Sequence, residues 1–156
     1  PVPINSANFK NFKVGLFTTA IAGVTTNYVI AFIFFPLYAL SSAHLNSTLG
    51  GQFLTLFLNM VFSYNLSIAV FNLLPFFPLD GFRVIESLTK PWNKVRNFLG
   101  RYGQYILLAL IFESFACNIL GRLWPICYEF NILGYVMTFA VRYIGWPIQA
   151  LWGLII

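Results

Sequence analysis

The segment FNLLPFFPLDG, residues 71–81, restricts the possible folds of this chain more than any other segment. It stands at the end of an apolar run that starts at Phe53. Pro75 and Pro78 lack backbone N–H groups, so they break a helix at this point. Asp80 follows, and an aspartate near the bilayer interior costs at least about 2.5 kcal/mol unless it has a partner, an ion or an aqueous path. A broken backbone at membrane depth is tolerated only where it is buried in protein or lines a wet cavity. The segment therefore predicts one half of a site embedded in a membrane protein.

The composition of the whole chain agrees with a membrane protein. Of its 156 residues, 59% are hydrophobic and 8% are charged, whereas ordinary soluble domains carry roughly 25% charged residues. The net charge is +5, but the basic residues stand beside apolar runs. They therefore indicate membrane topology, and no nucleic-acid partner is expected. His44 is the only histidine, so this chain cannot by itself supply a His-rich zinc site.

Four apolar stretches predict an all-α membrane protein, a polytopic bundle of transmembrane helices in which prolines break the helix before Asp80. About 20 apolar residues are enough to cross the bilayer as a helix. We expect a single transmembrane domain, and the predicted spans are residues 14–40, 53–74, 102–120 and 132–156. The last of these contains Arg142 and Pro147, which favour a kinked or interfacial element.

Charges between the spans orient the predicted bundle. Residues 83–101 hold five basic side chains, whereas residues 41–52 hold neither lysine nor arginine. Cytoplasmic loops carry the excess of basic residues, so we expect Asp80 to lie towards the cytoplasmic side of the membrane. Asp80, Arg83 and Glu86 recur every three residues and share one side of a helix. The simplest interpretation is an amphipathic helix whose charges pair with each other; in the other interpretation Arg83 and Glu86 pair while Asp80 has a separate role.

Two further polar features lie inside predicted spans. Glu113 is either a second functional carboxylate or a residue paired with a neighbouring helix, and we favour pairing. Residues 23–27 (GVTTN) form a small polar patch in the first span. Small residues allow close helix packing, and Asn or Thr can form hydrogen bonds between helices. The patch is therefore a packing notch or, through Asn27, a support for the site around Asp80.

Two stretches together resemble the site-2 protease family of intramembrane zinc metalloproteases, in its compact bacterial-type form. Residues 71–81 are similar to the family's second signature, in which an Asn is followed by Pro three residues later and by Asp-Gly eight residues later. The segments PVPIN at 1–5 and AGVTTN at 22–27 are similar to the family's Pro-Val-Pro loop and its Ala-Gly-Pro-x-x-Asn motif. Val24 stands where the family usually has Pro. The resemblance covers roughly residues 1–110.

The resemblance implies a metalloendopeptidase that hydrolyses peptide bonds of transmembrane protein substrates inside the lipid bilayer. Asp80 takes the role of a ligand to one zinc ion, and binding a cation relieves the cost of a buried carboxylate. Asn72 takes the role of a catalytic residue that donates a hydrogen bond to the oxyanion. Five further residues are expected to shape the site: Pro75, Pro78, Gly81, Gly23 and Asn27.

The family's His-Glu-x-x-His motif, which supplies two zinc ligands and the general base, does not occur in this sequence. We expect these groups upstream of Pro1, in a longer multi-pass protein of a bacterial cell membrane. This chain is then its C-terminal part, and alone it is expected to be inactive. Two alternatives stay open. One is an inactive homologue that binds membrane helices, and the other is an ion- or proton-translocating protein that uses Asp80 and Glu113.

Overall fold

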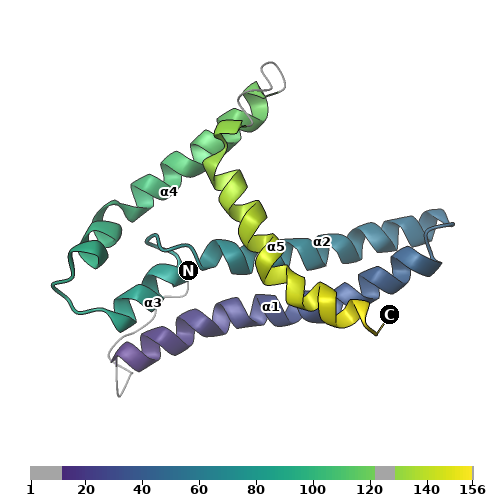
Figure 1. Cartoon of the computed structure of the whole chain (residues 1–156), viewed down its shortest axis with the longest axis horizontal. Coiled ribbons are helices and arrows are strands. Elements are labelled where there is room, and N and C mark those ends of the chain that lie inside the picture. Colours follow the sequence, from purple (N-terminus) through teal and green to yellow (C-terminus); the bar gives the residue numbers. More distant parts are fainter. Residues whose placement is uncertain (1–11, 122–128, 156) are drawn as a thin grey trace.

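The computed structural model describes residues 12–121 and 129–155, which form helices and connecting turns with no strand among them (Figure 1). The all-α fold class is therefore confirmed for this part of the chain. The helices, in order, are α1 (Phe12–His44), α2 (Leu49–Asn72), α3 (Asp80–Leu88), α4 (Lys94–Leu120) and α5 (Ile132–Gly153).

Three of the described helices are long and apolar enough to cross a membrane, judged by length and composition alone: Lys13–His44, Leu49–Asn72 and Lys94–Leu120. They overlap the first three predicted spans. Helix α5 occupies most of the fourth predicted span but does not belong to this set, and it continues as a helix through Pro147. Large apolar side chains such as Phe53 and Phe112 are more than two-thirds exposed, as residues that face lipid are.

Helices α1 and α2 form an antiparallel hairpin along the long axis of the molecule (Figure 1). Their connection is shorter than the predicted loop at 41–52, because α1 continues to His44 and α2 already begins at Leu49. Near this end, the Ser41 and Thr55 hydroxyls share a buried hydrogen bond of 2.8 Å between the two helices. This bond satisfies both hydroxyls where no water is available to do so.

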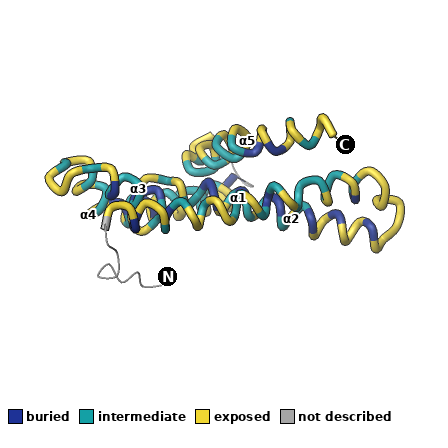
Figure 2. Tube along the Cα trace, turned by 90° about the horizontal axis from the view of Figure 1, so that it is seen from below, coloured by how far each residue is buried: buried dark blue, intermediate teal, exposed yellow. Residues whose placement is uncertain are grey.

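The apolar core lies where α5 crosses the α1–α2 hairpin. Figure 2 shows buried positions recurring along the hairpin and on α5, with intermediate and exposed positions between them. On α5, Gly145 leaves room for Leu66, whose Cδ2 would lie 2.7 Å from a Cβ at that position. Two tilted aromatic pairs extend the core: the ring centroids of Phe35 and Phe62 are 5.0 Å apart, and those of Phe32 and Trp152 are 5.5 Å apart. The buried centre consists of Ala31, Phe62, Leu66 and Ile148.

Helix α4 begins earlier than the third predicted span. Its first two turns, from Lys94, come from the basic segment before Tyr102 that the loop charges had marked as a connection. The cause is Asn93, whose side-chain oxygen accepts hydrogen bonds from the N–H groups of Val95 (2.9 Å) and Arg96 (3.1 Å), the usual geometry of a helix N-cap. From there α4 leaves the hairpin, and α5 returns across it (Figure 1).

Candidate functional site

The segment between α2 and α3 reverses the direction of the chain. Helix α2 ends at Asn72, just before the first of the two prolines, so the predicted break is observed. A hydrogen bond of 2.8 Å from the Leu79 N–H to the Phe76 carbonyl closes the turn. Helix α3 then begins at Asp80, with Leu79 in extended conformation at the N-cap. The two predicted site residues therefore mark the last residue of one helix and the first residue of the next.

Gly81 allows α3 to start directly against the end of α2. It is buried, and a Cβ at this position would lie 2.2 Å from the Leu73 carbonyl oxygen and 2.4 Å from that of Leu74. Backbone atoms cannot move aside as a flexible side chain can, so no larger residue fits without a shift of the backbone. This close contact fixes the residues that follow Asn72 against the residue that follows Asp80.

Helix α1 approaches the Asp80 carboxylate at Gly23. A Cβ at Gly23 would lie 3.2 Å from Asp80 Oδ2, so the absence of a side chain there leaves space beside the carboxylate. Helix α3 packs on α1, which explains how a residue from the first predicted span reaches the second motif. The two sequence motifs that carried the family resemblance therefore meet at this carboxylate.

The other oxygen of Asp80 is bound by Arg83. Arg83 Nη1 donates a hydrogen bond of 3.1 Å to Asp80 Oδ1, and the side chains are 30% and 21% exposed, respectively. Asp80 also stands in the first turn of α3, where the positive end of the helix dipole stabilises a carboxylate. The Arg83 contact orients the carboxylate and leaves Oδ2 on the side of Gly23.

The two asparagines predicted for the site, Asn27 on α1 and Asn72 on α2, are both half-buried. Asn72 is the last residue of α2, and Asn27 lies one turn after Gly23 on α1. Within the described part of the chain, neither side chain forms a hydrogen bond to another protein group. Their amides are therefore available to a ligand. Neither asparagine is hydrogen-bonded to Asp80, whose side-chain partner among the described residues is Arg83.

The expected pairing of Arg83 with Glu86 is wrong. Arg83 pairs with Asp80, while Glu86 forms an ion pair with Arg96 of α4. Spacing along α3 allowed both arrangements, and the approach of α4, which is remote in sequence, decides between them. The Arg83–Asp80 pair is one that the i,i+3 spacing of the charged residues on this helix allowed.

Glu113 is far from this site and contacts α5 instead. Its Oε1 accepts hydrogen bonds from the Ile132 N–H (3.2 Å) and from Cys117 Sγ (3.5 Å), whereas Oε2 is buried without a hydrogen-bond partner among residues 12–121 and 129–155. It lies about 25 Å along α4 from Arg96, where α4 meets α3. Glu113 thus holds the first turn of the neighbouring helix, as the favoured interpretation expected. Among the described residues it forms no ion pair with Arg142.

The described residues supply one plausible metal ligand and not a complete set. No group of three or more His, Cys, Asp or Glu side chains that could hold a metal ion occurs within residues 12–121 and 129–155. The Asp80 carboxylate fits one ligand position, because Oδ2 is turned to the glycine-lined side while Oδ1 is held by Arg83. The Pro-Val-Pro segment at 1–5 lies outside the described residues.

Comparison with known proteins gives two matches. Residues 40–112 match Peptidase family M50. The chain is also 33% identical over 132 residues to a Bacillus subtilis (strain 168) protein named "Putative zinc metalloprotease YwhC", covering 80% of this chain and 57% of that protein. The chain therefore spans little more than half the length of the curated relative that it matches. No solved structure matches the chain.

Proposed function

We propose that the chain, which matches Peptidase family M50 over residues 40–112 and is similar to a protein named "Putative zinc metalloprotease YwhC", belongs to the site-2 protease family and supplies the aspartate side of an intramembrane zinc centre. In the full-length protein this centre hydrolyses peptide bonds of transmembrane protein substrates. The observation that carries the proposal is the meeting of Gly23 with the Asp80 carboxylate, because it joins the two motifs around one candidate ligand.

Asp80 is the proposed ligand to a single zinc ion. Arg83 binds one carboxylate oxygen and is a positioning residue, so the other oxygen is left for the metal. The remaining ligands and the general base are expected in sequence outside this chain. The chemistry that zinc supplies in such a centre is the activation of a water molecule for attack on a carbonyl.

Asn72 is the proposed donor to the developing oxyanion. Its amide has no hydrogen-bond partner within the described residues, and its position at the end of α2 is fixed by the contact of Gly81 with the neighbouring backbone. A donor held in place before the reaction stabilises charge that appears only in the transition state. Asn27, one turn from Gly23, is proposed to line the same space.

The distribution of charge supports a site towards the cytoplasmic side of a bacterial cell membrane. The start of α1, the end of α2, α3 and the start of α4 lie at the same end of the molecule (Figure 1). Basic residues gather at this end: Lys13, Arg83, Lys90, Lys94, Arg96 and Arg101. The opposite turn, at 45–48, carries no charge. Basic residues favour the cytoplasmic face.

The ion-translocation alternative has less support than proteolysis. It requires Asp80 and Glu113 to serve one path, yet Glu113 binds the start of α5 far along α4. A cleavage assay distinguishes the other alternative, an inactive homologue that binds membrane helices, because such a homologue would not hydrolyse the substrate.

Cleavage of a reporter transmembrane substrate by the reconstituted full-length protein tests the proposal. Asn72→Ala is expected to lower the cleavage rate by about 100-fold or more while zinc stays bound, as loss of an oxyanion donor does. Asn59→Ala is the matched control, since Asn59 is on α2 but accepts a hydrogen bond from Ser63. Equal cleavage rates for the two variants would show that Asn72 has no catalytic role. Absence of cleavage by the wild type would contradict the assignment as a protease.

A further inference from the structure

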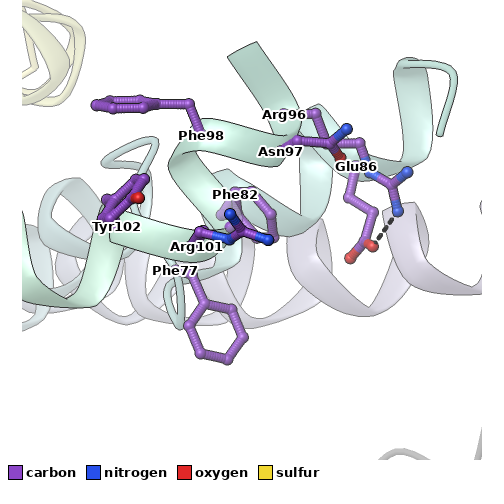
Figure 3. Close-up of a pocket in the computed structure, with 9 residues that line it drawn as sticks. Phe77, Phe82, Glu86, Arg96, Asn97, Phe98, Arg101 and Tyr102 are labelled. Carbon is purple, nitrogen blue, oxygen red and sulfur yellow. Dashed lines mark hydrogen bonds and ion pairs between the residues drawn. The ribbon is translucent and has the colours of Figure 1, made fainter. Parts of the chain in front are cut away.

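A cavity of about 790 Å³ lies between α3, the preceding turn and the first turns of α4. Figure 3 shows the Glu86–Arg96 pair on one side of it, Phe98 and Tyr102 on the other, and Arg101 between them. Phe82 of α3 lies behind Arg101 in this view. The lining thus combines aromatic surface with charged groups, on a part of the molecule that the proposed zinc centre does not use.

The charges that line this cavity leave one positive charge unbalanced. Glu86 and Arg96 neutralise each other in an ion pair, and Arg101 forms no ion pair with any described residue. A guanidinium presents parallel N–H groups that match the oxygens of a phosphate. The cavity therefore suits an anionic group of that kind.

The position of the cavity along α4 corresponds to the headgroup layer of a bilayer. Helix α4 has 27 residues, of which about 20 are needed to cross the hydrocarbon core. About seven residues therefore extend beyond the core at the basic end of α4; these include Arg96, and Arg101 and Tyr102 follow directly at the boundary. Trp92, just before α4, is 73% exposed, as tryptophans in the interfacial belt are.

An apolar groove continues from the cavity along α4. It has a volume of about 400 Å³ and is lined by Phe98, Tyr102, Tyr105, Ile106 and Ala109. Phe98 and Tyr102 line both spaces, so the basic cavity and the groove are adjacent along α4. A site for an anion thus passes into a site for hydrocarbon in the direction in which α4 enters the membrane.

We propose that the cavity and the groove together bind one anionic phospholipid, with its phosphate at Arg101 and an acyl chain along α4. An acidic peptide is a poorer match, because the groove runs into the bilayer and is apolar on its walls. The site stands whether or not the protein cleaves peptides, since neither Arg101 nor the groove residues belong to the proposed zinc centre.

Native mass spectrometry of the full-length protein, with phosphatidylglycerol or phosphatidylcholine of identical acyl chains added to the detergent, tests the proposal. Phosphatidylglycerol is expected to be retained in preference. Arg101→Gln is expected to weaken its binding by at least about tenfold, the usual effect of losing a charge-assisted hydrogen bond. Arg101→Lys keeps the charge and should recover part of the affinity.

Two matched controls distinguish a specific lipid site from nonspecific electrostatic attraction and from nonspecific hydrophobic contact with the lipid. Lys94→Gln removes an equal charge from an exposed residue about two turns earlier on the same helix that does not line the cavity, and it should leave the binding nearly unchanged. Tyr105→Ala should weaken the binding of the lipid. Phe112→Ala, on α4 but outside the groove, should not. Circular dichroism checks that each variant retains its helices.

Three results would overturn the site. Equal losses for Arg101→Gln and Lys94→Gln would mean that only diffuse charge attracts the lipid. Displacement of the lipid by inorganic phosphate at an equal concentration would mean that the groove contributes nothing. Preferential binding of a synthetic acidic peptide, with the same dependence on Arg101, would assign the cavity to a protein partner.

Discussion

The α1–α2–α3 unit and the α4–α5 arm are held together in different ways. In the first unit, backbone approaches backbone: Gly81 sits against the carbonyl oxygens of Leu73 and Leu74, and Gly23 leaves room for the Asp80 carboxylate. The arm is held to this unit mainly through side chains, with Ile148 of α5 in the apolar core and Arg96 of α4 paired with Glu86. Its backbone comes close to the first unit at Gly103, where a Cβ would lie 2.8 Å from the Phe77 nitrogen. A backbone contact leaves less freedom of movement than a contact between flexible side chains, and two such close approaches surround the candidate site.

The largest effect is expected from Gly81→Ala in the first unit. The added Cβ would overlap two carbonyl oxygens that cannot rotate away, so we expect the free energy of unfolding to fall by about 3 kcal/mol or more. Thermal unfolding in detergent measures this. Gly50→Ala, where a Cβ would meet nothing within 4 Å, is the control. Equal melting temperatures for the two variants would show that the backbone contact is not rigid.

A smaller effect is expected at the junction between α4 and α5. Glu113→Ala removes the acceptor for the first N–H of α5 and should cost about 1 kcal/mol, as the loss of a helix cap does. Glu113→Gln keeps an acceptor and removes the charge of a carboxylate whose second oxygen has no partner in the part of the chain that the structure describes, so it should not lower the free energy of unfolding. Hydrogen exchange of the amides at the start of α5 measures the effect of both Glu113 variants. Glu129→Ala, at an exposed residue, is the control. Faster exchange in the Gln variant than in the Ala variant would contradict the capping role.

The smallest effect is expected from the Glu86–Arg96 pair between α3 and α4. Both side chains are partly exposed, at 26% and 20%, so breaking the pair should cost only about 0.2–1 kcal/mol. Arg96→Glu is expected to lower the melting temperature, and the swap Glu86→Arg with Arg96→Glu should restore it. A swap that remains as unstable as the single reversal would mean that the pair does not hold the arm.

Sequence patterns predicted the elements well and their partners less well. Apolar runs marked the long helices, and the two prolines marked the break before Asp80, because these depend on local preferences. The Arg83–Glu86 pairing was wrong, since α4 brings Arg96 to Glu86 from a distant part of the chain. The early start of α4 was missed because its first turns are basic, and the cap at Asn93 outweighed that signal.

Only part of the candidate site could be predicted from the physical chemistry of its residues. The Asp80 carboxylate beside a proline break followed from the cost of charge in a membrane, whereas the roles of Asp80 and Asn72 came from a family resemblance. That Gly23 would lie against Asp80 depends on how α3 packs on α1, and no local pattern reports the packing of helices so far apart in sequence.

Zinc content of the purified full-length protein tests the central claim most directly. The wild type should carry one zinc ion per chain, Asp80→Ala should lose it, and Glu86→Ala, which removes a carboxylate from the same helix, should retain it. Retention of zinc by folded Asp80→Ala at the wild-type level, or a folded wild type that binds none, would contradict the assignment of Asp80 as a metal ligand.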